Sequence, residues 1–127
     1  MIAGIGTDIV SVARIARALE RHGEQFTAKV LTPMEQATCA RLARRAAYVA
    51  KRFAAKEAFF KAFGQPPSAA NTWHQLAIVN EEGGRPRLEF GPLLAESLRR
   101  HGIARWHVSL SDEHDFALAY IVLEKEQ

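Results

Sequence analysis

Residues 51–64 read Lys51-Arg52-Phe53-Ala54-Ala55-Lys56-Glu57-Ala58-Phe59-Phe60-Lys61-Ala62-Phe63-Gly64 and form the most informative helical segment of the chain. We expect the helix to begin before Tyr48 and to end at Gly64, because Pro66-Pro67 prevents its continuation. The phenylalanines near its C-terminal end point in several directions around the helix axis. The sequence therefore predicts a long helix that is buried over much of its surface.

The segments before this helix predict a strand and further helices. Ile2–Val10 is rich in β-branched residues and predicts a strand, and Ser11 is a suitable N-cap for a helix that ends at Gly23. Thr32-Pro33-Met34-Glu35 has the pattern of a capping box with proline at the first helical position. We expect the helix that starts there to continue into the long helix, with a break near Ala46.

The segments after the long helix predict two pairs of strands separated by a short helix. The expected elements are strands Trp73–Asn80 and Arg85–Phe90, helix Pro92–His101, and strands Trp106–Ser111 and Phe116–Leu123. The last strand is apolar on both faces, which is typical of a central strand. This order favours an α+β fold with a mainly antiparallel sheet packed against the long helix.

The composition indicates one soluble domain that spans residues 1–127. Hydrophobic residues make up 48% of the 127 residues and charged residues 24%, which is ordinary for a globular protein. Cys39 is the single cysteine, so an internal disulfide and a cysteine-based zinc site are excluded, and a reducing cytoplasm is the expected location. We find neither a signal peptide nor a membrane span and expect no membrane partner.

The charge is unevenly distributed along the chain. The net charge is +3, but residues 1–61 carry +6 and residues 62–127 carry −3. A basic N-terminal half suggests an anionic partner: a phosphate-rich cofactor, an acidic protein or a nucleic acid. A solvated helix surface would account for the same charges equally well.

Asp8 lies inside the apolar first strand and shares one face with Gly4 and Gly6. A carboxylate in such surroundings needs an ionic, hydrogen-bonding or metal partner. One interpretation is a carboxylate that binds metal or acts as a base, in a space that the glycines keep open. The alternative is that Asp8 ends the strand and caps the next helix.

Glu57 and Lys61 are spaced as an i,i+4 pair on one face of the long helix. In most helices this pattern is a surface salt bridge. Here Arg52, Lys56 and Lys61 surround a single acid, which would suit a phosphate ligand and one metal carboxylate. Asp8 and Glu57 together could hold Mg²⁺, with lysine or arginine nearby to complete a site for phosphoryl transfer.

Two blocks of sequence resemble a known family. Gly4-Ile5-Gly6-Thr7-Asp8-Ile9-Val10 followed by Arg14-Ile15, and Arg52-Phe53-Ala54-Ala55-Lys56-Glu57-Ala58 followed by Lys61-Ala62, are similar to the bacterial holo-acyl-carrier-protein synthases. These proteins are the short class of 4′-phosphopantetheinyl transferases. Asn80–Pro86, His107–Ser111 and Val122-Leu123-Glu124 extend the resemblance over nearly the whole chain.

The resemblance implies an enzyme that moves the phosphopantetheine arm of coenzyme A to a serine of apo acyl carrier protein in fatty acid biosynthesis. It assigns Asp8 and Glu57 to Mg²⁺, Lys61 to the transferring phosphoryl group, Arg52 to the nucleotide phosphates and Arg14 to the acidic carrier protein. Asp8, Glu57 or a metal-bound water could accept the proton of the serine. The resemblance also implies a homotrimer with its sites between subunits.

This chain departs from the family pattern at two places. Gln65-Pro66-Pro67 follows Gly64 where many relatives have Gly-Thr-Gly, and Asp112 stands where many have histidine.

Two other interpretations compete with an active transferase. One is a nucleic-acid-binding domain, which requires exposed aromatic residues on the sheet. The other is a relative that binds coenzyme A without turnover. We expect no nucleic-acid partner.

Overall fold

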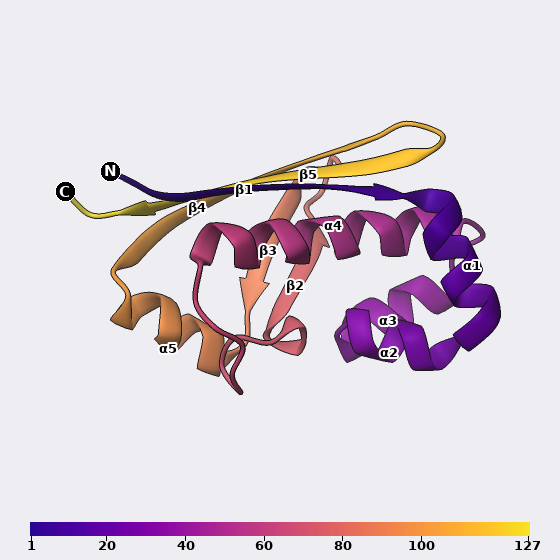
Figure 1. The fold of residues 1–127 in the computed structure, drawn as a ribbon, viewed down its shortest axis with the longest axis horizontal. Coiled ribbons are helices and arrows are strands. Elements are labelled where there is room, and N and C mark those ends of the chain that lie inside the picture. Colours follow the sequence, from indigo (N-terminus) through magenta and orange to yellow (C-terminus); the bar gives the residue numbers. More distant parts are fainter.

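The computed structural model describes all residues from 1 to 127 and has the predicted α+β fold (Figure 1). Its elements are β1 (Ile2–Ser11), α1 (Val12–His22), α2 (Glu24–Val30), α3 (Pro33–Ala40), α4 (Arg45–Phe63), the 3₁₀ turn η1 (Trp73–Gln75), β2 (Leu76–Asn80), β3 (Pro86–Phe90), α5 (Pro92–Arg100), β4 (Ile103–Asp112) and β5 (Phe116–Lys125).

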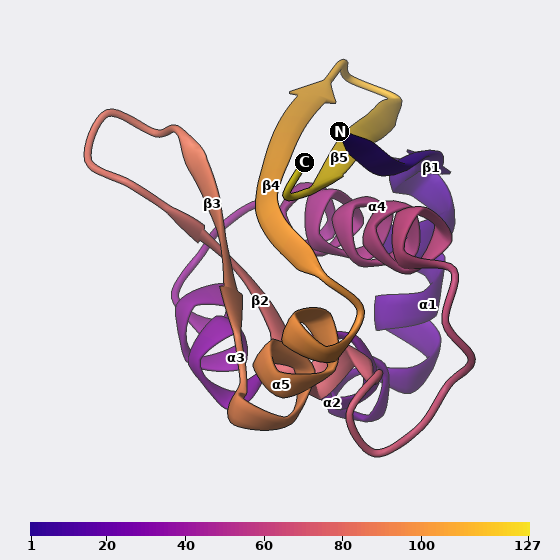
Figure 2. The same cartoon turned by 90° about the vertical axis from the view of Figure 1, so that its left-hand side faces the viewer.

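Two separate antiparallel sheets are formed. The larger has the strand order β1-β5-β4, so that β5 is the central strand, as its two apolar faces predict. Asp8 on β1 lies opposite Ala119 on β5, which in turn lies opposite Leu110 on β4. The hairpin of β2 and β3 forms the smaller sheet and projects away from the larger one (Figure 2).

Helix α4 lies along the inner face of the larger sheet and contacts β1 through two glycines (Figure 1). A Cβ atom on Gly6 would lie 1.9 Å from the carbonyl oxygen of Ala58, and one on Gly4 would lie 1.9 Å from that of Ala62. The expectation that these glycines keep a space open is therefore wrong. They allow the strand backbone to pack directly on the helix backbone.

The helix boundaries largely follow the signals in the sequence. The Ser11 hydroxyl accepts a hydrogen bond from the backbone N–H of Arg14 at 3.2 Å, so Ser11 caps α1 and the idea that Asp8 is the cap is wrong. Both hydrogen bonds of the capping box join Thr32 and Glu35 at the start of α3. The break before α4 covers residues 41–44, slightly earlier than predicted.

Helices α1, α2 and α3 gather at one end of α4, and α5 lies at the other (Figure 1). The buried side of β5, the long helix and the smaller sheet supply most of the hydrophobic core, including Phe59, Ile78 and Ile121. None of the helices combines the length and apolar character that are needed to cross a bilayer.

No helix covers the outer face of the larger sheet (Figure 1). Large apolar side chains are exposed there, with exposed fractions of 53% for Ile5, 61% for Ile9, 49% for Phe116 and 46% for Tyr120. Leu118 lies opposite Ile9 in the same register. We call Ile5, Ile9, Phe116, Leu118 and Tyr120 the outer apolar face.

Candidate functional site

Asp8 and Lys61 form an ion pair across the contact between β1 and α4. The Lys61 Nζ atom lies 3.0 Å from Asp8 Oδ1 and also donates to the carbonyl oxygen of Thr7 at 3.2 Å. The Asp8 side chain is 17% exposed and that of Lys61 is 53% exposed. The alternative of a surface salt bridge between Lys61 and Glu57 is wrong, because Lys61 reaches the strand instead.

Glu57 lies one helical turn before Lys61 on the same face of α4. The residue after it, Ala58, receives the backbone of Gly6 from β1, so the strand passes this turn of the helix. The half-buried Glu57 carboxylate has neither an ion-pair nor a hydrogen-bond partner in the chain, whereas Asp8 is paired with Lys61. Asp8 is therefore paired with Lys61, and Glu57 is an unpaired carboxylate on the helical turn that precedes Lys61.

The donor set at this turn fits a hard divalent cation. Mg²⁺ prefers oxygen ligands and is usually held by one or two carboxylates, with substrate phosphates and water as the remaining ligands. Asp8 and Glu57 supply two carboxylates, and Lys61 supplies a positive charge next to them. The chain contains no cluster of three or more metal-binding side chains. The site could thus hold Mg²⁺ with a phosphorylated ligand.

Lys56 does not belong to this group, and the expected ring of three basic side chains around Glu57 is not formed. Lys56 is fully buried and its Nζ atom lies 2.7 Å from Glu35 Oε1 on α3. Burial holds the pKa of Lys56 below its usual value of 10.5, and the Glu35 carboxylate partly opposes this shift. Sequence reasoning assigned Glu35 only to a capping box and missed this pair.

Arg52 is only 3% exposed and lies between α4 and β2. Its Nη2 atom donates to the carbonyl oxygen of Ile78 at 3.2 Å, and its guanidinium lies 4.0 Å from the ring centre of Tyr48. The buried Nε atom has no hydrogen-bond partner. A buried donor is costly to leave unpaired, so the Arg52 guanidinium is only partly satisfied within the chain.

A cavity of about 450 Å³ lies beside Arg52. Arg44, Lys51 and Arg52 provide three positive charges in its lining, and Asp112 from the end of β4 also borders it. The cavity has the charge that a phosphorylated ligand requires. Sequence reasoning missed Arg44 and Lys51, although their separation of seven residues places them on one side of the helix start.

Arg14 lies on the exposed side of α1, next to a second cavity of about 260 Å³. Arg14, Arg17 and Arg21 border this cavity together with Phe26 and Phe53. The two phenylalanine rings stack with their centres 6.4 Å apart. This surface therefore combines three positive charges with an aromatic floor.

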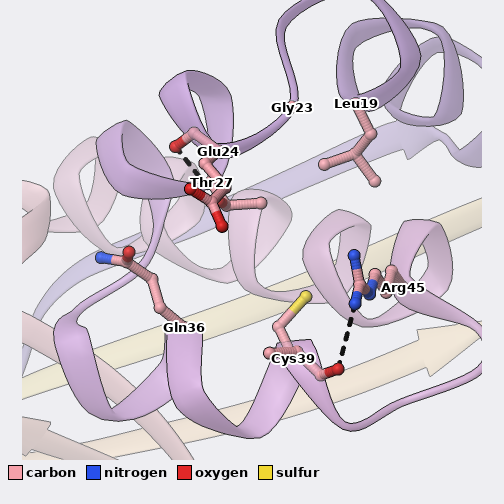
Figure 3. A pocket seen from close by; sticks show the side chains of 8 residues that line it. Leu19, Gly23, Glu24, Thr27, Gln36, Cys39 and Arg45 are labelled. Atoms are coloured by element: carbon pink, nitrogen blue, oxygen red, sulfur yellow. Dashed lines mark hydrogen bonds between the residues drawn. The ribbon is translucent and has the colours of Figure 1, made fainter.

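A third cavity, of about 210 Å³, lies among α1, α2, α3 and the start of α4 (Figure 3). Cys39 borders it, and the Arg45 guanidinium donates to the carbonyl oxygen of Ala40 at 3.0 Å. Burial raises the pKa of the Cys39 thiol, so the neutral form is favoured. Cys39 is thus a small packed residue, as the sequence predicts.

The structure is thus an α+β protein with a carboxylate and lysine group where β1 crosses α4 and a separate cavity lined by three basic side chains. Residues 4–121 match the model of the 4′-phosphopantetheinyl transferase superfamily. A holo-[acyl-carrier-protein] synthase from Dechloromonas aromatica is 46% identical over 124 residues, which cover 98% of each chain. The chain belongs to this superfamily and, within it, to the family of holo-acyl-carrier-protein synthases.

Two solved structures show the same fold. The crystal structure of holo-[acyl-carrier-protein] synthase from Neisseria meningitidis has a TM-score of 0.93 and 43% identity, covering 98% of this chain and 100% of that one. The synthase from Bacillus anthracis, solved in complex with CoA (3′,5′-ADP), has a TM-score of 0.81 and 32% identity, with 99% of both chains covered. The predicted family and fold are confirmed.

Proposed function

We propose that this protein transfers the 4′-phosphopantetheine group of coenzyme A to a serine of an apo acyl carrier protein, in fatty acid biosynthesis. The products are the holo carrier protein and adenosine 3′,5′-bisphosphate. The observation that carries this proposal is the group of Asp8, Glu57 and Lys61, where β1 crosses α4 in a chain of this family. The serine nucleophile comes from the carrier protein, so the enzyme needs to supply only positioning and charge.

Asp8 and Glu57 are the residues that would hold Mg²⁺. When bound, this ion neutralises negative charge on the diphosphate of coenzyme A. Lys61 adds a positive charge beside the transferring phosphoryl group, and its contacts to Asp8 and Thr7 fix the direction of its ammonium group. Groups that are already oriented toward developing charge lower the barrier without further reorganisation.

Arg52 contributes to the binding of the nucleotide phosphates. Its place in the lining of the 450 Å³ cavity supports this role. Lys51 and Arg44 add charge to the same cavity. Asp112 also borders it, so the departure from the family pattern at this position places a negative charge near the nucleotide.

Arg14 binds the acidic carrier protein. Its exposure on α1, together with Arg17 and Arg21 around the 260 Å³ cavity, supports electrostatic attraction of an acidic surface. Phe26 and Phe53, which line the same cavity, offer an apolar contact beside these basic side chains. Such a combination suits a partner helix that carries acidic residues around an apolar side chain.

The protein acts as a homotrimer with its sites between subunits. The outer apolar face supports this arrangement, because exposed apolar patches on a sheet commonly mark protein interfaces. Phe116 and Tyr120 expose aromatic rings on this face, as a nucleic-acid-binding sheet would. The β4 residues opposite Tyr120 and Leu118 are Ser109 and Ser111, which carry no positive charge, so this part of the face does not favour binding of a phosphate backbone. The lone cysteine supports a cytoplasmic location.

Mass spectrometry of an apo carrier protein tests the reaction. Incubation with this protein, coenzyme A and Mg²⁺ should add the mass of one phosphopantetheine group to the serine-bearing peptide. A chelator should prevent the modification, and a carrier variant with alanine in place of that serine should remain unmodified. A wild-type carrier protein that stays unmodified would contradict the proposed reaction. A gain in mass that the chelator does not prevent would contradict the metal dependence.

A further inference from the structure

The ammonium group of Lys56 is a buried connection point between helices and strands. Besides Glu35, it donates to the carbonyl oxygen of Val30 at 2.7 Å and to that of Trp73 at 3.2 Å. These three acceptors match the three donors of an ammonium group. Lys56 thus joins α4 to the end of α2, to α3 and to η1.

The Glu35 carboxylate extends these connections to the smaller sheet. Its Oε1 atom accepts from the backbone N–H of Thr32 at 2.9 Å as well as from Lys56, and its Oε2 atom accepts from the backbone N–H of Ile78 at 2.9 Å. Glu35 is 3% exposed. Glu35 on α3 and Lys56 on α4 are thus hydrogen-bonded to three further elements, α2, η1 and β2. These hydrogen bonds fix the directions of both side chains, because each bond requires a particular angle.

The side of α4 that carries Lys56 is adjacent to the side that carries Glu57. Successive residues in a helix project about 100° apart, so fixing Lys56 in the helical layer also fixes the direction of Glu57. On the opposite side, Gly4 and Gly6 bring β1 onto the backbone of α4, and Lys61 donates to Asp8 and to the Thr7 carbonyl oxygen. The rotation of α4 about its axis is therefore held from two sides, by β1 on one and by Lys56 with Glu35 on the other.

We infer that Glu35 and Lys56 form a positioning pair that holds Glu57 in the direction required to share a divalent cation with Asp8. This inference rests on the proposed function, since it takes Asp8 and Glu57 as the metal ligands. Neither member of the pair touches the substrate. Their effect is exerted through the rotation of α4, and second-sphere groups of this kind tune metal affinity.

The test compares the single variants Glu35→Gln and Lys56→Met with Lys29→Met, which removes an exposed charge on α2. Circular dichroism and thermal unfolding establish which variants are folded at the assay temperature. For folded Glu35→Gln and Lys56→Met we expect kcat to fall by about 10- to 100-fold, with the KM for the carrier protein unchanged. Lys29→Met should behave like the wild type.

A second readout does not depend on turnover. Mn²⁺ serves as the probe, and its binding is measured by electron paramagnetic resonance with coenzyme A present and the carrier protein absent. We expect Mn²⁺ affinity to fall by about 10-fold or more in the two variants. Folded variants with wild-type kcat and wild-type Mn²⁺ affinity would overturn the positioning role.

The double variant Glu35→Leu/Lys56→Met covers the case in which a single variant does not fold. Replacing both buried charges by apolar residues avoids an unpaired charge, so this variant should fold. It should still have low kcat and weak Mn²⁺ binding, because the directional hydrogen bonds are gone. Recovery of both properties, or failure of the double variant to fold, would assign the pair to stability alone and overturn the inference.

The outcome for the wild type separates this inference from the proposed function. Wild-type protein that binds Mn²⁺ without modifying any carrier protein refutes the proposed reaction, and the comparison of Mn²⁺ affinities then decides the positioning role. Wild-type protein that binds no Mn²⁺ overturns the positioning role and the proposed metal dependence, and the mass of the carrier protein then decides the reaction. Wild-type turnover with unimpaired Glu35→Gln and Lys56→Met variants overturns the positioning role only.

Discussion

Lys61 on α4 pairs with Asp8 on β1 at 3.0 Å and leaves Glu57, four residues before it on the same helix face, without a partner. The pairing of Lys61 with Asp8 rather than with Glu57 has a chemical consequence. One carboxylate is oriented by a lysine and a strand, whereas the other remains free to bind an ion. The two carboxylates thus differ in their surroundings: Asp8 on β1 is paired, and Glu57 on α4 is not.

Replacement of Glu57 by glutamine should abolish Mg²⁺-dependent modification of the carrier protein while leaving the fold intact. Glutamine keeps the shape of the side chain but removes the negative charge that would bind the cation. We expect kcat to fall by about 100-fold or more, with little change in thermal unfolding because Glu57 has no partner to lose. Glu96→Gln on α5 is the control, and full activity of Glu57→Gln would remove Glu57 from the mechanism.

Replacement of Gly6 by alanine should destabilise the protein through the contact between β1 and α4. The new Cβ atom would lie 1.9 Å from the carbonyl oxygen of Ala58, and a helix backbone cannot move aside cheaply. We expect a loss of about 1–3 kcal/mol in the free energy of unfolding, measured by chemical denaturation. Gly91→Ala should cost less, because the nearest atoms there are the end of the Gln75 side chain, which can shift at the cost of its two hydrogen bonds to α5, whereas a helix backbone cannot. Equal losses would count against this explanation.

The fold could be predicted where local signals mark the ends of elements. Ser11, the capping box of Thr32 and Glu35, and Gly64 all act at their predicted positions, because each signal involves residues within a few positions of one another. Helix α2 was missed because it has only seven residues and its N-cap, Gly23, provides no side-chain hydrogen bond. The division of the strands into two sheets depends on tertiary packing, which no local pattern encodes.

The candidate site was predictable as a set of residues but not as a set of contacts. The pairing of Lys61 with Asp8 joins residues 53 positions apart and depends on where β1 crosses α4. The charges in residues 51–61 look alike in sequence, yet Lys56 turns into the helical layer and Lys61 toward the strand. The two lysines differ in which element packs against their side of α4: α3 packs against the side of Lys56, and β1 against the side of Lys61.

Reversal of the charge at Arg14 should weaken recognition of the carrier protein without affecting coenzyme A. We expect Arg14→Glu to raise the KM for the carrier protein by about 10-fold or more and to reduce its dependence on salt concentration. Arg100→Glu on α5, at the opposite end of the molecule (Figure 1), makes the same change in net charge and should have little effect. Steady-state kinetics at two ionic strengths measures both quantities, and similar effects of the two variants would indicate a nonspecific attraction.

Stability at acidic pH should depend on Glu124. Its carboxylate accepts a hydrogen bond from His107 at 2.6 Å, and this bond, with Arg105 nearby, holds the pKa of Glu124 below its usual value of 4.5. A carboxyl group with a depressed pKa contributes stability above pH 4.5 that is lost as the pH falls through the lowered value. Glu124→Gln should therefore be less stable than the wild type at pH 7 but should approach it as the pH falls well below 4.5. Chemical denaturation across this range measures the difference, and Glu113→Gln, on an exposed turn, should run parallel to the wild type.

The outer apolar face should control both assembly and activity. Ile9 is 61% exposed and lies opposite Leu118, so an aspartate at position 9 would place a charge within the proposed interface. We expect the wild type to sediment as a trimer and Ile9→Asp to sediment as a monomer with low activity, since each site would lack its neighbouring subunit.

Leu93→Asp provides the matched control, because Leu93 is 50% exposed on α5 and lies outside the sheet. It should leave both the sedimentation coefficient and the activity unchanged. A fully active wild-type monomer would contradict the proposed trimer, and a trimeric Ile9→Asp variant would show that the subunits meet through another surface. If Ile9→Asp is monomeric yet fully active, each site is complete within one chain, and the outer apolar face serves assembly alone.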